Sequence, residues 1–262
     1  MINLIRADFY RILKNKLALI SLIIAAVIPF VLAAAFLGLR EIFVSLDPET
    51  EDIIGFMLNA RALIATTFSY TNNFGIVIPV FTALIIMADI NGGVIRNKII
   101  LGYNRHKIFS SLFITTLVYS LAIMVIYAAM TAFWSVVLLG MNEMDKEQIL
   151  SMVYFYILGF VGLVFMVSIV STIGLSTLST PAAIIISLVI CMVLGLVNST
   201  VSAFDYSEFK HIIQFVPGFV VASYSVGNID FTAFLEGLTA NIIFGGAIYL
   251  AGTFAFDHKD LK

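Results

Sequence analysis

Six long apolar segments constrain the fold of this chain more than any other feature of its sequence. A helix needs about 20 residues to cross the hydrocarbon core of a bilayer. Of the 262 residues, 61% are hydrophobic and only 11% are charged, whereas a typical soluble domain is about 25% charged. We therefore predict an all-α integral membrane protein that forms a single domain. The expected transmembrane helices are 17–39, 73–89, 108–139, 151–178, 182–202 and 237–256.

The charges between these segments predict a topology. Ten of the fourteen Lys and Arg residues fall in 1–16, 90–107 and 257–262, and twelve of the sixteen acids fall in the other three charged loops. Because cytoplasmic loops carry the excess of Lys and Arg, both termini are expected in the cytoplasm. The loop before the last span is unusually apolar around Pro217, and we expect it to re-enter the membrane from outside.

The predicted spans lack the groups that catalysis or ion coupling inside a membrane requires. No Asp, Glu, Lys, Arg or His lies within a span away from its ends, although ion-coupled carriers usually hold such groups near the midplane. No phosphate-binding loop of the G-x-x-x-x-G-K-[ST] type occurs, nor any Cys and His spacing typical of a metal site. We expect no catalytic residue, metal or cofactor on this chain and no nucleic-acid partner.

The first 16 residues predict an amphipathic helix that lies on the cytoplasmic surface of the lipid bilayer. Its apolar residues recur at helical spacing, and the basic residues fall elsewhere on the helix. The candidate interfacial residues are Ile5, Phe9, Arg11 and Ile12. The alternative is that this segment is only a positive flank that sets the orientation of the first span.

The short loop at 90–107 is the strongest candidate for a functional site. It is cationic and contains a small helical pattern, 94–101, with glycines on both sides. A cationic loop between two spans faces the cytoplasm, and a short helix there is suited to dock a soluble partner. The alternative is that its cations only hold the loop inside. The candidate docking residues are Asp89, Gly92, Gly93, Ile95, Arg96, Lys98, Ile99, Gly102 and Arg105.

Hydroxyl and amide side chains mark the third, fourth and fifth spans. They could line a path for an amphipathic substrate, or they could simply hydrogen-bond between helices and to their own backbone. The candidate pathway residues are Thr116, Ser120, Ser168, Thr172 and Asn198.

Over nearly its full length the chain resembles the ABC-2 type permeases, the membrane subunits of ABC exporters. Those proteins share an interfacial helix, six spans, a coupling helix between spans two and three, and a re-entrant external segment. Their coupling region has an acid at the end of span two, then a glycine, an apolar-basic helix and an arginine. The similar positions here are Asp89, Gly93, 94–101 and Arg105. This sequence departs from the family in having Asp rather than Glu as the acid, and Ser110 and Ser111 where a lysine is common.

The resemblance implies that two permease subunits, identical or different, pair in a bacterial plasma membrane and that each docks a separate ATP-binding subunit. ATP and Mg²⁺ would be bound on that partner. Ile95 and Ile99 are then expected to offer an apolar face, and Arg96 and Lys98 to pair with acids of the partner. The apolar spans favour an amphipathic or hydrophobic cargo, such as a peptide, antibiotic or toxin. An uncoupled channel and a non-transporting anchor or sensor subunit remain the alternatives.

Overall fold

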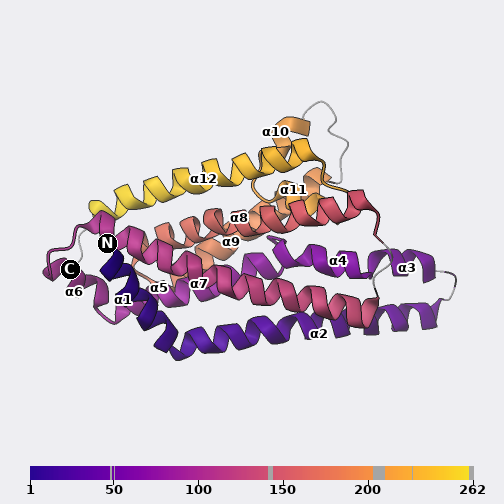
Figure 1. The fold of residues 1–262 in the computed structure, drawn as a ribbon, viewed down its shortest axis with the longest axis horizontal. Helices are drawn as coiled ribbons and strands as arrows, with labels where there is room; N and C mark the ends of the chain where they lie inside the picture. Colours follow the sequence, from indigo (N-terminus) through magenta and orange to yellow (C-terminus); the bar gives the residue numbers. More distant parts are fainter. Residues whose placement is uncertain (48, 50, 141–143, 203–209, 226, 260–262) are drawn as a thin grey trace.

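The computed structural model describes residues 1–47, 49, 51–140, 144–202, 210–225 and 227–259. Within these ranges every regular element is a helix (Figure 1). The elements are α1 (Ile2–Lys14), α2 (Lys16–Leu46), α3 (Glu51–Met57), α4 (Ala60–Ala65), the 3₁₀ helix η2 (Thr66–Phe68), α5 (Asn73–Asn91), α6 (Val94–Ile100), α7 (Arg105–Trp134), the π-helix η3 (Ser135–Leu139), α8 (Lys146–Thr177), α9 (Thr180–Ser202), α10 (Lys210–Gln214), α11 (Phe219–Ser223) and α12 (Phe231–Asp257).

Among the described residues, six helical segments are long and apolar enough to cross a membrane, which confirms the number predicted from the sequence. They are Lys16–Leu46, Ile53–Asn91, Arg105–Leu139, Lys146–Thr177, Thr180–Thr200 and Phe231–Asp257. Four of them, α2, α7, α8 and α12, begin before the predicted limits, each at a polar N-cap: Asn15, Asn104, Asp145 and Asp230. For example, Asp145 and Gln148 form a capping box that starts α8 five residues before its apolar stretch.

The second of these segments is interrupted, and its last part, α5, begins at residue 73, where the predicted span at 73–89 begins. Helix continues from α4 through η2, breaks at residues 69–72, and resumes as α5. The break folds back against the first turn of α5, where the amide of Gly75 donates to the carbonyl of Ser69 at 3.3 Å. A side chain at Gly75 would collide with the carbonyl of Tyr70, so a glycine is required there.

Four of the long helices pack in two pairs, and α5 and α9 pack against each other and against α8. Figure 1 shows α8 and α12 running side by side along one edge of the bundle, and α2 and α7 along the other. A glycine permits the close approach of α12, because a Cβ atom on Gly245 would lie 3.1 Å from the backbone nitrogen of Phe165 in α8. The helices α1 and α6 and the last turn of α12 gather at one end of the bundle, and α3, α10 and α11 lie towards the other (Figure 1).

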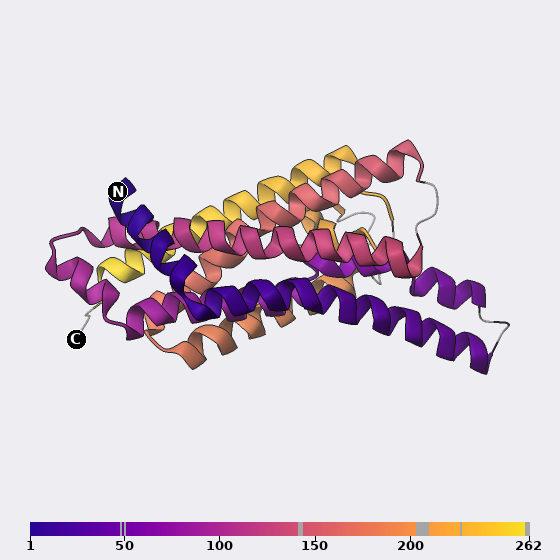
Figure 2. The ribbon, with the colours of Figure 1, turned by 60° about the horizontal axis from the view of Figure 1, so that its bottom comes forward.

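Helix α1 crosses the end of the bundle at a steep angle to α2, as the turned view in Figure 2 shows. A single residue, Asn15, separates the two helices. Its backbone is extended, with φ −78° and ψ 123°, and its side chain accepts a hydrogen bond from the amide of Leu17 at 2.9 Å. Asn15 thus ends one helix and caps the next.

Candidate functional site

Two glycines set the limits of α6, as the sequence predicted. Gly93 precedes the helix with φ 68°, and Gly102 follows it with φ 82°, a left-handed conformation that side chains disfavour. After the last turn, the amide of Tyr103 donates to the carbonyl of Lys98 at 3.2 Å, and that of Gly102 donates to Ile99 at 2.9 Å. These two bonds form a Schellman motif, so α6 is a defined short helix at the end of the bundle.

The outward face of α6 differs from the one that the sequence led us to expect. Ile95 is only 3% exposed and packs into the core with Ile99 partly buried beside it, so the predicted apolar docking face points inward. Ile100 and Leu101, which the sequence reasoning missed, are both 74% exposed, and Arg96 is exposed as expected. The reason is that positions 95 and 99 are four residues apart and share the face that rests on α5 and α7.

Lys98 also points into the protein, where it binds Asp8 of α1. Its Nζ lies 2.6 Å and 2.7 Å from the two carboxylate oxygens of Asp8, and Asp8 is fully buried. Ser111 of α7 donates to the second of these oxygens at 2.7 Å. The expectation that Lys98 pairs with an acid of a partner is therefore wrong for this structure, because its charge is already neutralised within the chain.

Arg11 extends the same network to α5. Its guanidinium lies 3.0 Å from Asp8 and also forms an ion pair with Asp89, which is 5% exposed. We call Asp8, Arg11, Asp89, Lys98 and Ser111 the Asp8 cluster. It contains two acids and two bases, so its formal charges balance, and it joins α1, α5, α6 and α7.

The sequence reasoning placed Arg11 on the bilayer surface and Asp89 in the docking loop, and it missed Asp8 entirely. A signal for Asp8 was present, since it lies at four-residue spacing between Leu4 and Ile12 on α1. Leu4, Asp8 and Ile12 are all buried, and together they form the face of α1 that packs on the bundle. The prediction that Ile12 belongs to the exposed apolar face of α1 is therefore wrong, because Ile12 lies on the buried face.

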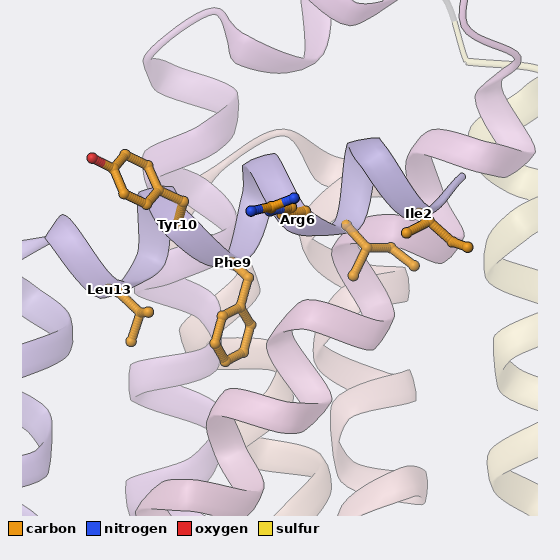
Figure 3. A pocket seen from close by; sticks show the side chains of 6 residues that line it. Ile2, Arg6, Phe9, Tyr10 and Leu13 are labelled. Carbon is orange, nitrogen blue, oxygen red and sulfur yellow. The ribbon is translucent and has the colours of Figure 1, made fainter.

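The exposed face of α1 is a second apolar surface. Figure 3 shows side chains along it, with Phe9 and Leu13 projecting to one side of α1 and Tyr10 to the other. A shallow groove of about 450 Å³ runs along these residues. It is lined by Ile2, Ile5, Arg6, Phe9, Tyr10 and Leu13. Ile5 and Phe9 thus share a surface groove on one helix, and the contact of this face with a bilayer stays a prediction.

Arg105 fastens the start of α7 to the end of α12. Its Nη1 donates to the carbonyls of Phe256 at 3.4 Å, Asp257 at 2.8 Å and Lys259 at 2.5 Å. The next residue, His106, pairs with the carboxylate of Asp257. A guanidinium at a helix C-terminus satisfies carbonyls that lack partners within the helix. Arg105 therefore has an internal role that was not predicted.

Four of the five candidate pathway residues form hydrogen bonds within or between helices, as in the alternative that the sequence left open. Thr116 and Ser168 donate to carbonyls of their own helices at 2.6 Å and 2.7 Å. Ser120 bonds Thr82 of α5 at 3.1 Å, and the hydroxyl of Thr172 donates to the carbonyl of residue 248 in α12 at 3.2 Å. Asn198 donates to the carbonyl of residue 217 at 3.4 Å and also lines a pocket.

Comparison with known proteins gives one family. A family model described as "Protein of unknown function (DUF2705)" matches residues 22–256, which is most of the chain. No curated protein matches the sequence.

Proposed function

We propose that this chain, which belongs to the DUF2705 family, is the permease subunit of an ATP-driven exporter and docks a separate ATP-binding subunit through α6. The observation that carries the proposal is that one short helix presents exposed apolar side chains at its end and also holds a buried ion pair to the rest of the protein. Ile100 and Leu101 are exposed at the tip, whereas Lys98, on the opposite face, is bound to Asp8.

The exposed face of α6 has the composition of a protein-binding surface. Two large aliphatic side chains are each 74% exposed, Tyr103 beside them is 40% exposed, and Arg96 adds an exposed positive charge. A contiguous apolar patch bordered by a cation is typical of interaction sites. Because the face lies beyond the apolar helices, we assign it to a soluble partner and not to lipid.

The inward face of α6 supports a role in transmission. The Asp8 cluster and the packing of Ile95 tie α6 to α1, α5 and α7. A force applied at the exposed tip would therefore reach three helices at once, because buried ion pairs resist separation. This is the arrangement that an ATP-driven movement of the membrane helices needs.

The remaining features of the proposal follow from the positive-inside rule and from the resemblance to ABC-2 permeases. Both termini and α6 lie in the cytoplasm, and α10 and α11 re-enter the membrane from outside. Two permease subunits, identical or different, pair in a bacterial plasma membrane with two copies of the ATPase, which holds ATP and Mg²⁺. The cargo is a peptide, antibiotic or toxin of amphipathic or hydrophobic character.

The test is co-purification from native membranes in mild detergent, with bound proteins identified by mass. The wild-type chain should recover an ATP-binding subunit, and Leu101→Glu should lower that recovery about tenfold or more, since a buried leucine contributes about 1.5–3 kcal/mol. Leu46→Glu is the matched control, because Leu46 is 75% exposed and is the last residue of α2, which ends at the other end of the bundle (Figure 1). Recovery of this chain alone, in a form that still conducts or binds cargo, would favour an uncoupled channel.

A non-transporting anchor or sensor subunit would also recover the ATPase, so co-purification does not separate it from a permease. Stimulation of ATP hydrolysis by a hydrophobic peptide or drug does. The complex of a permease should hydrolyse ATP faster in the presence of cargo, whereas the complex of an anchor should keep its basal rate.

A further inference from the structure

The interruption at residues 69–72 lies deep within the bundle. The hydroxyl of Tyr70 is 3.6 Å from the position that a Cβ atom on Gly162 would take. Gly162 is at the middle of α8, so about 23 Å of helix extends beyond it in each direction. Irregular backbone at such a depth is tolerated when it is buried in protein or lines a cavity.

A second irregular segment meets the first at this level. The chain turns between α10 and α11 at Gly218, which has φ 85°. A side chain at Gly218 would collide with the ring of Tyr70, so the two segments are in contact because residue 218 is a glycine. Asn198 of α9 joins the same region by donating to the carbonyl of Pro217 at 3.4 Å.

A pocket of about 330 Å³ lies between these segments and α9. Its lining residues are small or polar, and none of them is charged: Ala62, Ala65, Thr66, Ser69, Tyr70, Thr71, Asn72, Gly195, Asn198, Ser199, Ala222 and Ser225. The volume is at the lower end of the range for small-molecule sites. A charged ligand would find no counter-ion on these walls, so the lining favours a neutral one.

The serine and threonine hydroxyl groups of the pocket present mainly acceptors. Thr66, Ser199 and Ser225 each donate their proton to a carbonyl three residues earlier, at 2.7 Å, 3.0 Å and 3.0 Å. Ser69 and Thr71 bond each other at 3.0 Å, which uses one of their two protons. A hydroxyl that donates within its own helix keeps lone pairs for a ligand N–H.

We infer that this pocket binds a neutral group rich in N–H donors, such as the amide of a peptide, with the apolar part of the ligand against the alanines and the Tyr70 ring. The ligand class follows from the lining. The identification of this ligand as cargo rests on the proposed export function. If the ligand is the cargo, its chemical class restricts the cargo to peptides.

Cysteine labelling tests the site on the full chain in detergent, without ATP or an ATPase. In a Cys191→Ala background, Ser199→Cys should react with a water-soluble maleimide, and saturating N-acetylleucinamide should slow the reaction about tenfold. Thr200→Cys is the matched control. Thr200 is exposed and donates to the same carbonyl, that of Leu196, but it does not line the pocket. Its labelling should be unchanged by the amide.

Two ligand controls define the chemistry. N-acetylleucine carries a carboxylate in place of the terminal amide, and its methyl ester lacks the terminal N–H donors, so both should protect about three- to tenfold less. Equal protection by all three compounds would show that the pocket does not select ligands by their N–H donors and would overturn the inference. If Ser199→Cys fails to fold, Ser225→Cys replaces it with Ser223→Cys as its control, because both serines donate to the carbonyl three residues earlier.

The outcomes separate this inference from the proposed function. Protection of position 199 without cargo-stimulated ATP hydrolysis would leave the pocket standing as a binding site and would contradict the exporter. Cargo-stimulated hydrolysis without protection at position 199 or 225 would leave the exporter standing and place its cargo elsewhere. No protection at either position, or equal slowing at the control positions, would overturn the inference.

Discussion

Replacement of Lys98 by methionine should destabilise the attachment of α1 more than any other single change on α6. Lys98 donates to both oxygens of the Asp8 carboxylate, and the two side chains are 8% and 0% exposed. Removing one partner of a buried ion pair leaves an uncompensated charge, which costs about 3–5 kcal/mol. Arg11 still lies 3.0 Å from Asp8, so we expect the lower end of that range, about 3 kcal/mol.

A double-mutant cycle separates the ion pair from simple loss of packing. Asp8→Asn with Lys98→Met removes both charges and keeps most of the volume. The double variant should therefore lose less unfolding free energy than the sum of the losses in the two single variants. The coupling free energy should be about 1.5–3 kcal/mol, the upper part of the range for contacting residues. Ser111→Ala is the internal comparison, since it removes one hydrogen bond to the same carboxylate and should cost about 1.5–3 kcal/mol.

Hydrogen exchange of the α1 amides, residues 2–14, measures this attachment directly. The exchange of α1 should be faster in Lys98→Met, whereas the central turns of α8 should keep their protection and serve as the control for global unfolding. Additive effects in the cycle, or an unchanged exchange rate of α1 in the single variant, would refute the conclusion that Asp8 and Lys98 hold α1 on the bundle.

Two further changes test other parts of the same end of the bundle. Arg105→Gln should remove the cation from the last carbonyls of α12, which should destabilise the end of that helix by about 1–2 kcal/mol. Hydrogen exchange at residues 252–257 should then become faster. Unchanged protection there would show that Arg105 does not cap the helix. Gly93→Ala should destabilise the start of α6 by about 1 kcal/mol in a chemical unfolding measurement, because alanine at φ 68° is strained. The same substitution at Gly246 in α12, where an added Cβ atom would also meet nothing within 4 Å, serves as the comparison, and equal losses at the two positions would contradict this explanation.

The apolar pattern was sufficient to predict the six long helices, because the length and composition of each segment are local properties. The limits of α6 were also predictable, since Gly93 and Gly102 supply the left-handed conformations that end a helix. The face that α6 presents was not predictable in this way. A seven-residue helix with isoleucines at 95, 99 and 100 has apolar groups on more than one side, and only the packing against α5 and α7 decides which of them is buried.

The Asp8 cluster and the break at 69–72 depend on contacts between residues far apart in the sequence. Asp8 and Lys98 are separated by 90 residues, and nothing local distinguishes Lys98 from the exposed Arg96 two positions earlier. The break lies beside an apolar run that continues to read as helix, and it is stabilised by Gly75 and by the remote Gly218. Sequence periodicity reports which face of a helix is apolar, but it does not report what that face meets.

The single extended residue between α1 and α2 has a mechanical consequence. The Asp8 cluster binds helix α1 to α5, α6 and α7, whereas a single residue, Asn15, forms the covalent connection between α1 and the long apolar helix α2. A residue outside a helix contributes two soft backbone torsions, so Asn15 can act as a pivot while both helices stay rigid. A movement of α6 would be passed to α1, and rotation about the backbone of Asn15 would let α1 move while α2 keeps its own axis. The first span could then be left at rest while the ends of the others are moved.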